Sequence, residues 1–112
     1  MKIYHNPRCR KSRETLGIIK SAKVNPEIVE YLNSPPTENE LKNILKMLEI
    51  SPLDLLRKGE SIYKEKYKGK KFNEENWIKI MVKNPILIER PIVVKNGKAI
   101  LGRPPENVKI FL

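Results

Sequence analysis

The sequence has only one cysteine among its 112 residues, and this scarcity excludes two arrangements. A single cysteine cannot form an internal disulfide framework, and its use fits a reducing cytoplasm. The residue three positions after Cys9 is Ser12, so the Cys-x-x-Cys pair of many redox proteins is missing as well. Any disulfide that Cys9 forms must therefore involve another molecule.

Long apolar runs and aromatic residues are also scarce. No segment has the roughly 20 apolar residues of a membrane-spanning helix, and the N-terminus lacks a signal-peptide pattern. We therefore expect a cytoplasmic protein without membrane contact. Aromatic residues make up 6% of the chain, which weakens any platform for stacking single-stranded bases. We expect neither a bound metal nor a bound cofactor, and we expect a monomer.

Positive charge is abundant, with a formal net charge of +10 at pH 7. Nucleic acid is the obvious partner of so basic a chain, but the lysines are spread along its whole length, which favours a solvated surface instead. Arginine is rarer, with 6 residues against 17 lysines. Its planar fork matches a tetrahedral oxyanion better than lysine does. Three arginines surround Cys9 (Arg8, Arg10 and Arg13), and three lie beside apolar residues or proline (Arg57, Arg90 and Arg103).

Cys9 stands where a predicted strand ends and a helix begins. Residues 1–4 alternate between apolar and polar, and Asn6-Pro7 opens a turn. A helical pattern then runs from near Cys9 to before Asn25-Pro26. A helix N-terminus presents free N–H groups and the positive end of the macrodipole, which favour a thiolate and can hold an oxyanion. An exposed thiol among cations there predicts a reactive cysteine with a lowered pKa, although a lone cysteine is more often a small buried hydrophobe.

The middle of the chain predicts a sheet interrupted by helices. Residues 27–32 form a second strand, which completes a parallel βαβ unit. Residues 34–84 form a helical insertion whose first helix is capped by Thr37 and Glu40 and buries a leucine-rich stripe that ends at Leu48. The other predicted elements of the insertion are a short helix from Ser51-Pro52 to near residues 57–59, a partly helical, mobile segment at 61–71, and a helix at 73–83 that buries Trp77, Ile78 and Met81.

The C-terminal part changes to a strand pattern. Residues 92–94 and 99–101 form a hairpin around Asn96-Gly97. A last short helix turns Val108, Phe111 and Leu112 inward. We expect a single domain over residues 1–112.

This order of elements, with a thiol at the start of the first helix, is that of the thioredoxin-like fold. The chain also resembles the glutaredoxin-dependent arsenate reductases, the ArsC family, over nearly its whole length. The segments that carry the resemblance are 3–7 with Cys9, Ser12 and Arg13, then Tyr31-Leu32, 35–37, 55–58, 85–94 and 102–104. It implies an α/β thioredoxin-like fold with an inserted helical subdomain. It also implies reduction of arsenate to arsenite, with glutathione as co-substrate and glutaredoxin as partner.

The resemblance also implies roles for single residues. Cys9 matches the nucleophile, His5 a histidine that helps to keep the thiolate, and Ser12 a hydroxyl near the sulfur. The residues that match three oxyanion-binding arginines are Arg57, Arg90 and Arg103. Pro91 stands where this fold places a cis-proline. Arg10-Lys11 departs from the small residues that some members have after the nucleophile.

Each supporting residue has a simpler interpretation. His5 fits an ordinary hydrogen-bonded histidine, Ser12 a partner of a helix-start amide, Arg57 a cation at a helix C-terminus, and Arg103 a turn cap. Two other functions also remain open. One is a glutathione-linked thiol oxidoreductase acting on another anion, and the other is an RNA polymerase-binding regulator of the Spx type. The missing Cys-x-x-Cys pair argues against a regulator with a redox switch.

Overall fold

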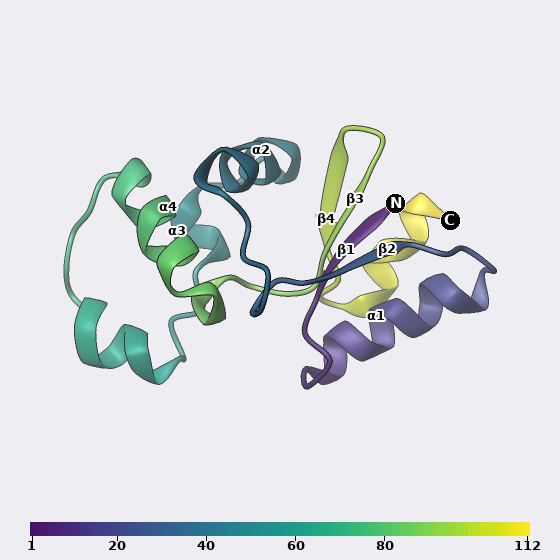
Figure 1. The fold of residues 1–112 in the computed structure, drawn as a ribbon, viewed down its shortest axis with the longest axis horizontal. Coiled ribbons are helices and arrows are strands. Elements are labelled where there is room, and N and C mark those ends of the chain that lie inside the picture. Colours follow the sequence, from purple (N-terminus) through teal and green to yellow (C-terminus); the bar gives the residue numbers. More distant parts are fainter. The chain divides into compact units, whose positions relative to one another are not determined.

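Four short strands form one mixed sheet in the order β2-β1-β3-β4, and the computed structural model describes residues 1–112 (Figure 1). β1 (Lys2–His5) runs parallel to β2 (Glu27–Glu30) and antiparallel to β3 (Ile92–Lys95). β3 pairs antiparallel with β4 (Lys98–Leu101). The parallel βαβ unit and the C-terminal hairpin predicted from the sequence are therefore both present.

The chain divides into two compact units, which we call the sheet unit and the helical unit. The sheet unit comprises Met1–Ser34 and Arg90–Leu112, and the helical unit comprises Pro35–Glu89. The helical unit extends past the predicted limit of the insertion at residue 84. It does so because Ile88 forms an antiparallel bridge with Leu56, which keeps the segment after residue 84 among the helices.

The core of the sheet unit lies between the sheet, the helix α1 (Arg10–Ser21) and the 3-10 helix η3 (Pro105–Phe111). α1 and η3 lie side by side (Figure 1). The buried residues of this core are Ile3, Ile19, Val93, Val108 and Phe111.

One inward residue of the sequence prediction is wrong in this unit. Leu112 remains 46% exposed. A 3-10 helix repeats every three residues, so Val108 and Phe111 share its inner face and the next residue falls off that face.

The helical unit holds α2 (Glu38–Leu48), α3 (Pro52–Leu55) and α4 (Glu74–Lys83), with a π-helix, η1 (Tyr63–Tyr67), and a 3-10 helix, η2 (Pro85–Leu87). The predicted burial of Trp77, Ile78 and Met81 is confirmed. α3 ends earlier than predicted, because Leu56 leaves the helix to form its bridge.

The predicted capping box at the start of α2 is present. The Glu40 N–H donates to Thr37 Oγ1 over 3.1 Å, and the Thr37 N–H donates to Glu40 Oε1 over 3.3 Å. The leucine-rich stripe of α2 was predicted to be buried as far as Leu48. Leu48 is only half-buried.

Aromatic packing gives the lysine-rich segment its regular structure. Tyr63 of η1 stacks on Trp77 of α4, with ring centroids 6.5 Å apart. Tyr67 of η1 meets Trp77 edge-on, with ring centroids 6.3 Å apart. Phe72 meets Trp77 edge-on at 5.0 Å. Such pairs stabilise by about 0.5–1.5 kcal/mol each beyond the area that they bury. None of the helices is both long and apolar enough to cross a membrane.

Candidate active site

Cys9 is the N-cap of α1. Its backbone is extended, with φ −91° and ψ 123°. The Cys9 N–H donates to the Asn6 carbonyl over 3.0 Å, and the Cys9 carbonyl accepts the Arg13 N–H over 3.0 Å, which closes the first helical turn. The predicted position of the thiol at a helix start is therefore confirmed. The thiol is half-buried rather than exposed.

The pKa of the Cys9 thiol lies below its ordinary value. Burial acts to raise this pKa, but hydrogen bonding from the Arg90 side chain and from the Ser12 N–H lowers it. The charge of Arg90 and the Lys11 N–H act in the same direction and complete the net decrease. The direction of this shift agrees with the prediction, and Arg90, the one arginine that contributes to it, lies far from Cys9 in the sequence.

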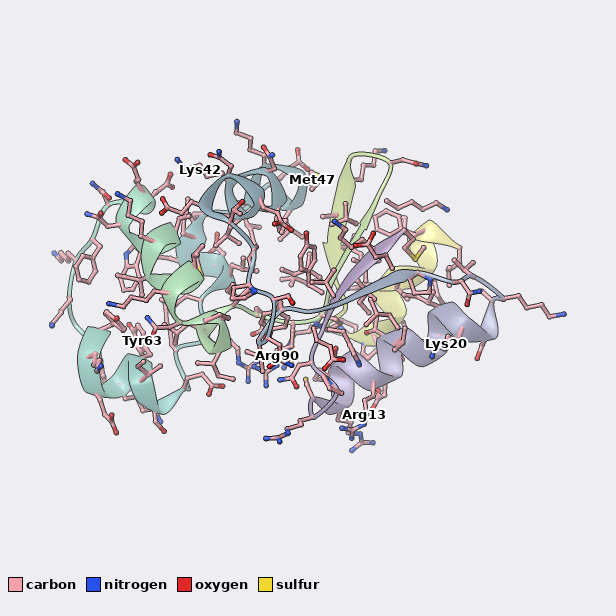
Figure 2. The ribbon with its side chains drawn as sticks, in the orientation of Figure 1. Arg13, Lys20, Lys42, Met47, Tyr63 and Arg90 are labelled. Carbon is pink, nitrogen blue, oxygen red and sulfur yellow. The ribbon has the colours of Figure 1, made fainter.

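The groups that lower the pKa of Cys9 do not include the arginines next to it in sequence, which are Arg8, Arg10 and Arg13. Arg10 pairs with Glu14 over 2.7 Å, and both side chains are largely exposed. Arg13 donates to the Pro7 carbonyl over 3.1 Å, and its end points outward from α1 (Figure 2). The first turn of α1 contains no acidic residue, so no carboxylate neutralises the positive end of the helix there. The predicted local cationic field is therefore replaced by Arg90 and the helix start itself.

His5 and Ser12 form a buried pair beneath the loop before Cys9. His5, the last residue of β1, is 6% exposed, and Ser12 is fully buried. His5 Nδ1 lies 2.6 Å from Ser12 Oγ, which also accepts the Asn6 N–H over 3.0 Å. The amide that Ser12 binds therefore belongs to the loop, whereas the sequence analysis considered a helix-start amide.

The surroundings of the His5 imidazole favour its neutral form. Burial lowers its pKa below the ordinary 6.5, Glu30 acts to raise it, and Lys20 and Arg13 lower it further. A neutral imidazole exchanges a hydrogen bond with the Ser12 hydroxyl and adds no positive charge to the loop.

Arg90 and Arg103 are joined within the sheet unit. Arg103 Nη1 donates to the Arg90 carbonyl over 3.2 Å. The peptide bond between Arg90 and Pro91 is cis, as predicted, and so is the one between Arg103 and Pro104, which the sequence analysis did not predict. Cys9, Arg90 and Arg103 thus belong to one unit, in which Arg90 bonds to the thiol and Arg103 bonds to the backbone of Arg90.

Arg57 belongs to the helical unit and is held by two carboxylates. Its Nε donates to Glu60 over 3.0 Å and its Nη1 donates to Glu89. Burial acts to lower the pKa of Arg57, but Glu60 and Glu89 outweigh it and raise the pKa. The predicted convergence of Arg57 on Cys9 stays a prediction.

The two carboxylate partners of Arg57 differ in whether the sequence could have predicted them. Glu60 follows Arg57 at the i,i+3 spacing of paired charges, which is a usable signal. Glu89 lies far along the chain and has no such signal.

No group of three or more histidine, cysteine, aspartate or glutamate side chains is arranged to hold a metal ion.

Comparison with known proteins gives consistent matches. The model of the ArsC family matches residues 4–111. The chain is 52% identical over 110 residues to the uncharacterized protein YfgD of Escherichia coli (strain K12), covering 96% of this chain and 92% of that protein. It is 39% identical over 114 residues to an arsenate reductase of Neisseria meningitidis serogroup A, covering 100% and 97%. The structure of an arsenate reductase from Vibrio cholerae matches with a TM-score of 0.93 and 41% identity, covering 99% and 96%. The predicted α/β thioredoxin-like fold is confirmed.

Proposed function

Because the chain belongs to the ArsC family, we propose that it is an arsenate reductase that uses glutathione as co-substrate and glutaredoxin as electron donor. The observation that carries this proposal is the pairing of Cys9 with Arg90 at the start of α1. A thiolate is the nucleophilic form of cysteine, and the same cation that stabilises it also attracts an oxyanion.

The chemistry needs one thiol from the chain and one from outside it. The Cys9 thiolate attacks arsenic and forms a sulfur–arsenic bond, and one arsenate oxygen is protonated and leaves as water. Arg90 and Arg103 offset the charge on the remaining oxygens. A second thiol then takes Cys9 into a disulfide, and arsenic keeps the electron pair and leaves as arsenite. The chain has no second cysteine, so we assign this step to glutathione.

The product of this step is a mixed disulfide between Cys9 and glutathione. Glutaredoxin reduces it by thiol–disulfide exchange and returns Cys9 to the thiol. Such a cycle belongs in a reducing compartment, and we propose that the protein works in the cytoplasm. We also propose that it works as a monomer, since Cys9, Arg90 and Arg103 come from one chain.

The test is arsenate-dependent consumption of NADPH in the presence of glutathione, glutaredoxin and glutathione reductase. Turnover that needs both glutathione and glutaredoxin supports the proposal, and the variant Cys9→Ser is the control without a nucleophile. Turnover when thioredoxin and its reductase replace the glutathione system would refute the assigned donor. An absence of turnover with active partners would refute arsenate as the substrate and favour a glutathione-linked thiol oxidoreductase for another anion.

A further inference from the structure

Gly102 lies at the end of β4, where that strand meets both Pro91 and α1. Its N–H donates to the Pro91 carbonyl over 2.9 Å, and the residue is buried. A Cβ at this position would lie 2.4 Å from Thr15 Oγ1, 2.7 Å from Pro91 Cγ and 3.0 Å from Thr15 Cγ2. Carbon does not approach other heavy atoms so closely. The φ angle of Gly102 is not positive, so glycine is required here by the close approach of its neighbours and not by the backbone conformation.

The two neighbours of Gly102 cannot move aside easily. Thr15 is fully buried and β-branched, and its hydroxyl donates to the Lys11 carbonyl over 2.8 Å. The side chain of Pro91 is a closed ring and is also buried. A methyl group on Gly102 would therefore displace the end of β4 from α1, displace Pro91, or do both.

The same three residues adjoin, in sequence or on one helix, the thiol and the two candidate arginines of the sheet unit. Arg90 directly precedes Pro91, and Arg103 directly follows Gly102. Thr15 lies on α1, whose N-cap is Cys9. The contact between Thr15, Gly102 and Pro91 is thus the point at which the helix that carries the thiol meets the segments that carry the two arginines.

We propose that Thr15, Gly102 and Pro91 form a positioning joint, which sets the distance from Arg90 and Arg103 to the sulfur of Cys9. Gly102 and Thr15 are positioning residues and act through the arginines. The part of this inference that concerns oxyanion binding rests on the proposed function. The part that concerns the thiolate does not depend on the substrate.

The first experiment compares Gly102→Ala with Gly17→Ala. A Cβ at Gly17, in the middle of α1, would meet nothing within 4 Å, so this variant adds the same methyl group without a clash. We expect Gly102→Ala to move the midpoint of iodoacetamide alkylation of Cys9 to higher pH. We also expect its kcat/KM for arsenate to fall by about 10- to 100-fold, the scale of a misplacement near 1 Å. Gly17→Ala should keep both wild-type values.

A rescue variant separates positioning from general damage. The double variant Thr15→Ala/Gly102→Ala removes both Thr15 atoms that the new methyl would meet and leaves only the approach to Pro91 Cγ, so the rescue should be partial. Its alkylation midpoint should return toward the wild-type value, even though the lost threonine lowers its thermal stability. If the alkylation midpoint of the double variant is shifted further than that of Gly102→Ala, the proposed positioning role of these residues is refuted.

Should Gly102→Ala fail to fold, Thr15→Ala alone tests the same contact by removing one wall. We expect a smaller rise of the alkylation midpoint and of KM. A lower melting temperature with an unchanged midpoint, in either single variant, would show a merely structural contact. If the wild-type protein reduces no arsenate, the proposed function fails, and the alkylation midpoints alone still decide whether the joint exists.

Discussion

Arg90 in the sheet unit and Arg57 in the helical unit stand in opposite electrostatic settings. Arg90 donates to a thiol whose pKa it lowers. Arg57 donates to two carboxylates, those of Glu60 and Glu89. The charge of Arg90 therefore acts on the nucleophile, whereas the charge of Arg57 is offset within its own unit.

The sequence analysis assigned only oxyanion binding to Arg57, Arg90 and Arg103, but Arg90 also lowers the pKa of the thiol. An arginine that stabilises the thiolate should change the pH dependence of the thiol when it is altered. An arginine that only binds the oxyanion should change KM and leave the thiol unchanged. Guanidinium has five N–H donors, so Arg57 keeps donors for an anion beyond the bonds to its two carboxylates.

The largest effect should come from removing the nucleophile on which this comparison depends. Cys9→Ser should lower arsenate turnover by about 1,000-fold or more, because a serine hydroxyl is not ionised at neutral pH. Serine is a favourable N-cap, so the helix start should survive. The coupled NADPH assay measures the loss, and a thermal melt measures the fold. Activity near the wild-type level would mean that Cys9 is not the nucleophile.

Arg90→Lys should have the next largest effect. Lysine keeps the charge but loses the planar fork, so we expect the alkylation midpoint of Cys9 to move up toward the free-thiol value of about 8.5. We also expect kcat/KM for arsenate to fall by about 10- to 100-fold, as expected for a displaced charged contact. Arg13→Lys is the matched control, because Arg13 points outward (Figure 2) and does not contribute to the pKa of Cys9. Equal effects of the two substitutions would contradict the claim that Arg90, and not Arg13, stabilises the thiolate of Cys9.

Arg57→Lys sharpens the comparison from the other side. We expect KM for arsenate to rise by about tenfold, the loss of one charge-assisted contact, while the alkylation midpoint of Cys9 stays at its wild-type value. Glu89→Gln should have the opposite sign and lower KM, because it removes a carboxylate that offsets the charge of Arg57. An unchanged KM in both variants would limit Arg57 to a structural role. A shifted midpoint would place Arg57 beside Arg90 in function.

Local features were the ones that could be predicted from the sequence. The capping box of Thr37 and the helix start at Cys9 depend on neighbouring residues, and both are present. The Asn96-Gly97 turn is local as well, with φ of 49° and 76° at its two residues. Capping, turn geometry and periodicity need only a few adjacent side chains, so the pattern of the chain determines them.

The partners of the candidate site could not be predicted in the same way. Composition marked Arg90 as unusual, but only the fold shows that it reaches the thiol while the arginines beside Cys9 do not. Glu89 meets Arg57 only because a β-bridge brings their segments together. Gly102 is required by a contact with Thr15 across the sheet unit, and a lone glycine before an arginine gives no sign of that contact.

The smallest expected effect concerns His5, the neutral group beside the charged site. Its pKa is lowered by burial first, raised in part by Glu30, and lowered again by Lys20 and Arg13. In the unfolded chain His5 takes up a proton near pH 6.5, while in the folded chain it stays neutral to a lower pH. The unfolded state therefore binds more protons below about pH 6.5, and the stability that neutral His5 contributes is present above that pH and is lost as the pH falls.

His5→Gln should therefore reduce the loss of stability between pH 7.5 and pH 5, which urea unfolding midpoints at the two pH values would measure. Glu30→Gln is the informative partner, because it removes the one group that raises the pKa of His5 and so should steepen the loss. Both variants should keep the wild-type alkylation midpoint of Cys9, since His5 is not among the groups that shift the pKa of the thiol. A midpoint that moves with His5→Gln as far as with Arg90→Lys would show that His5 keeps the thiolate directly, and the contrast between a neutral histidine and a charged arginine would be lost.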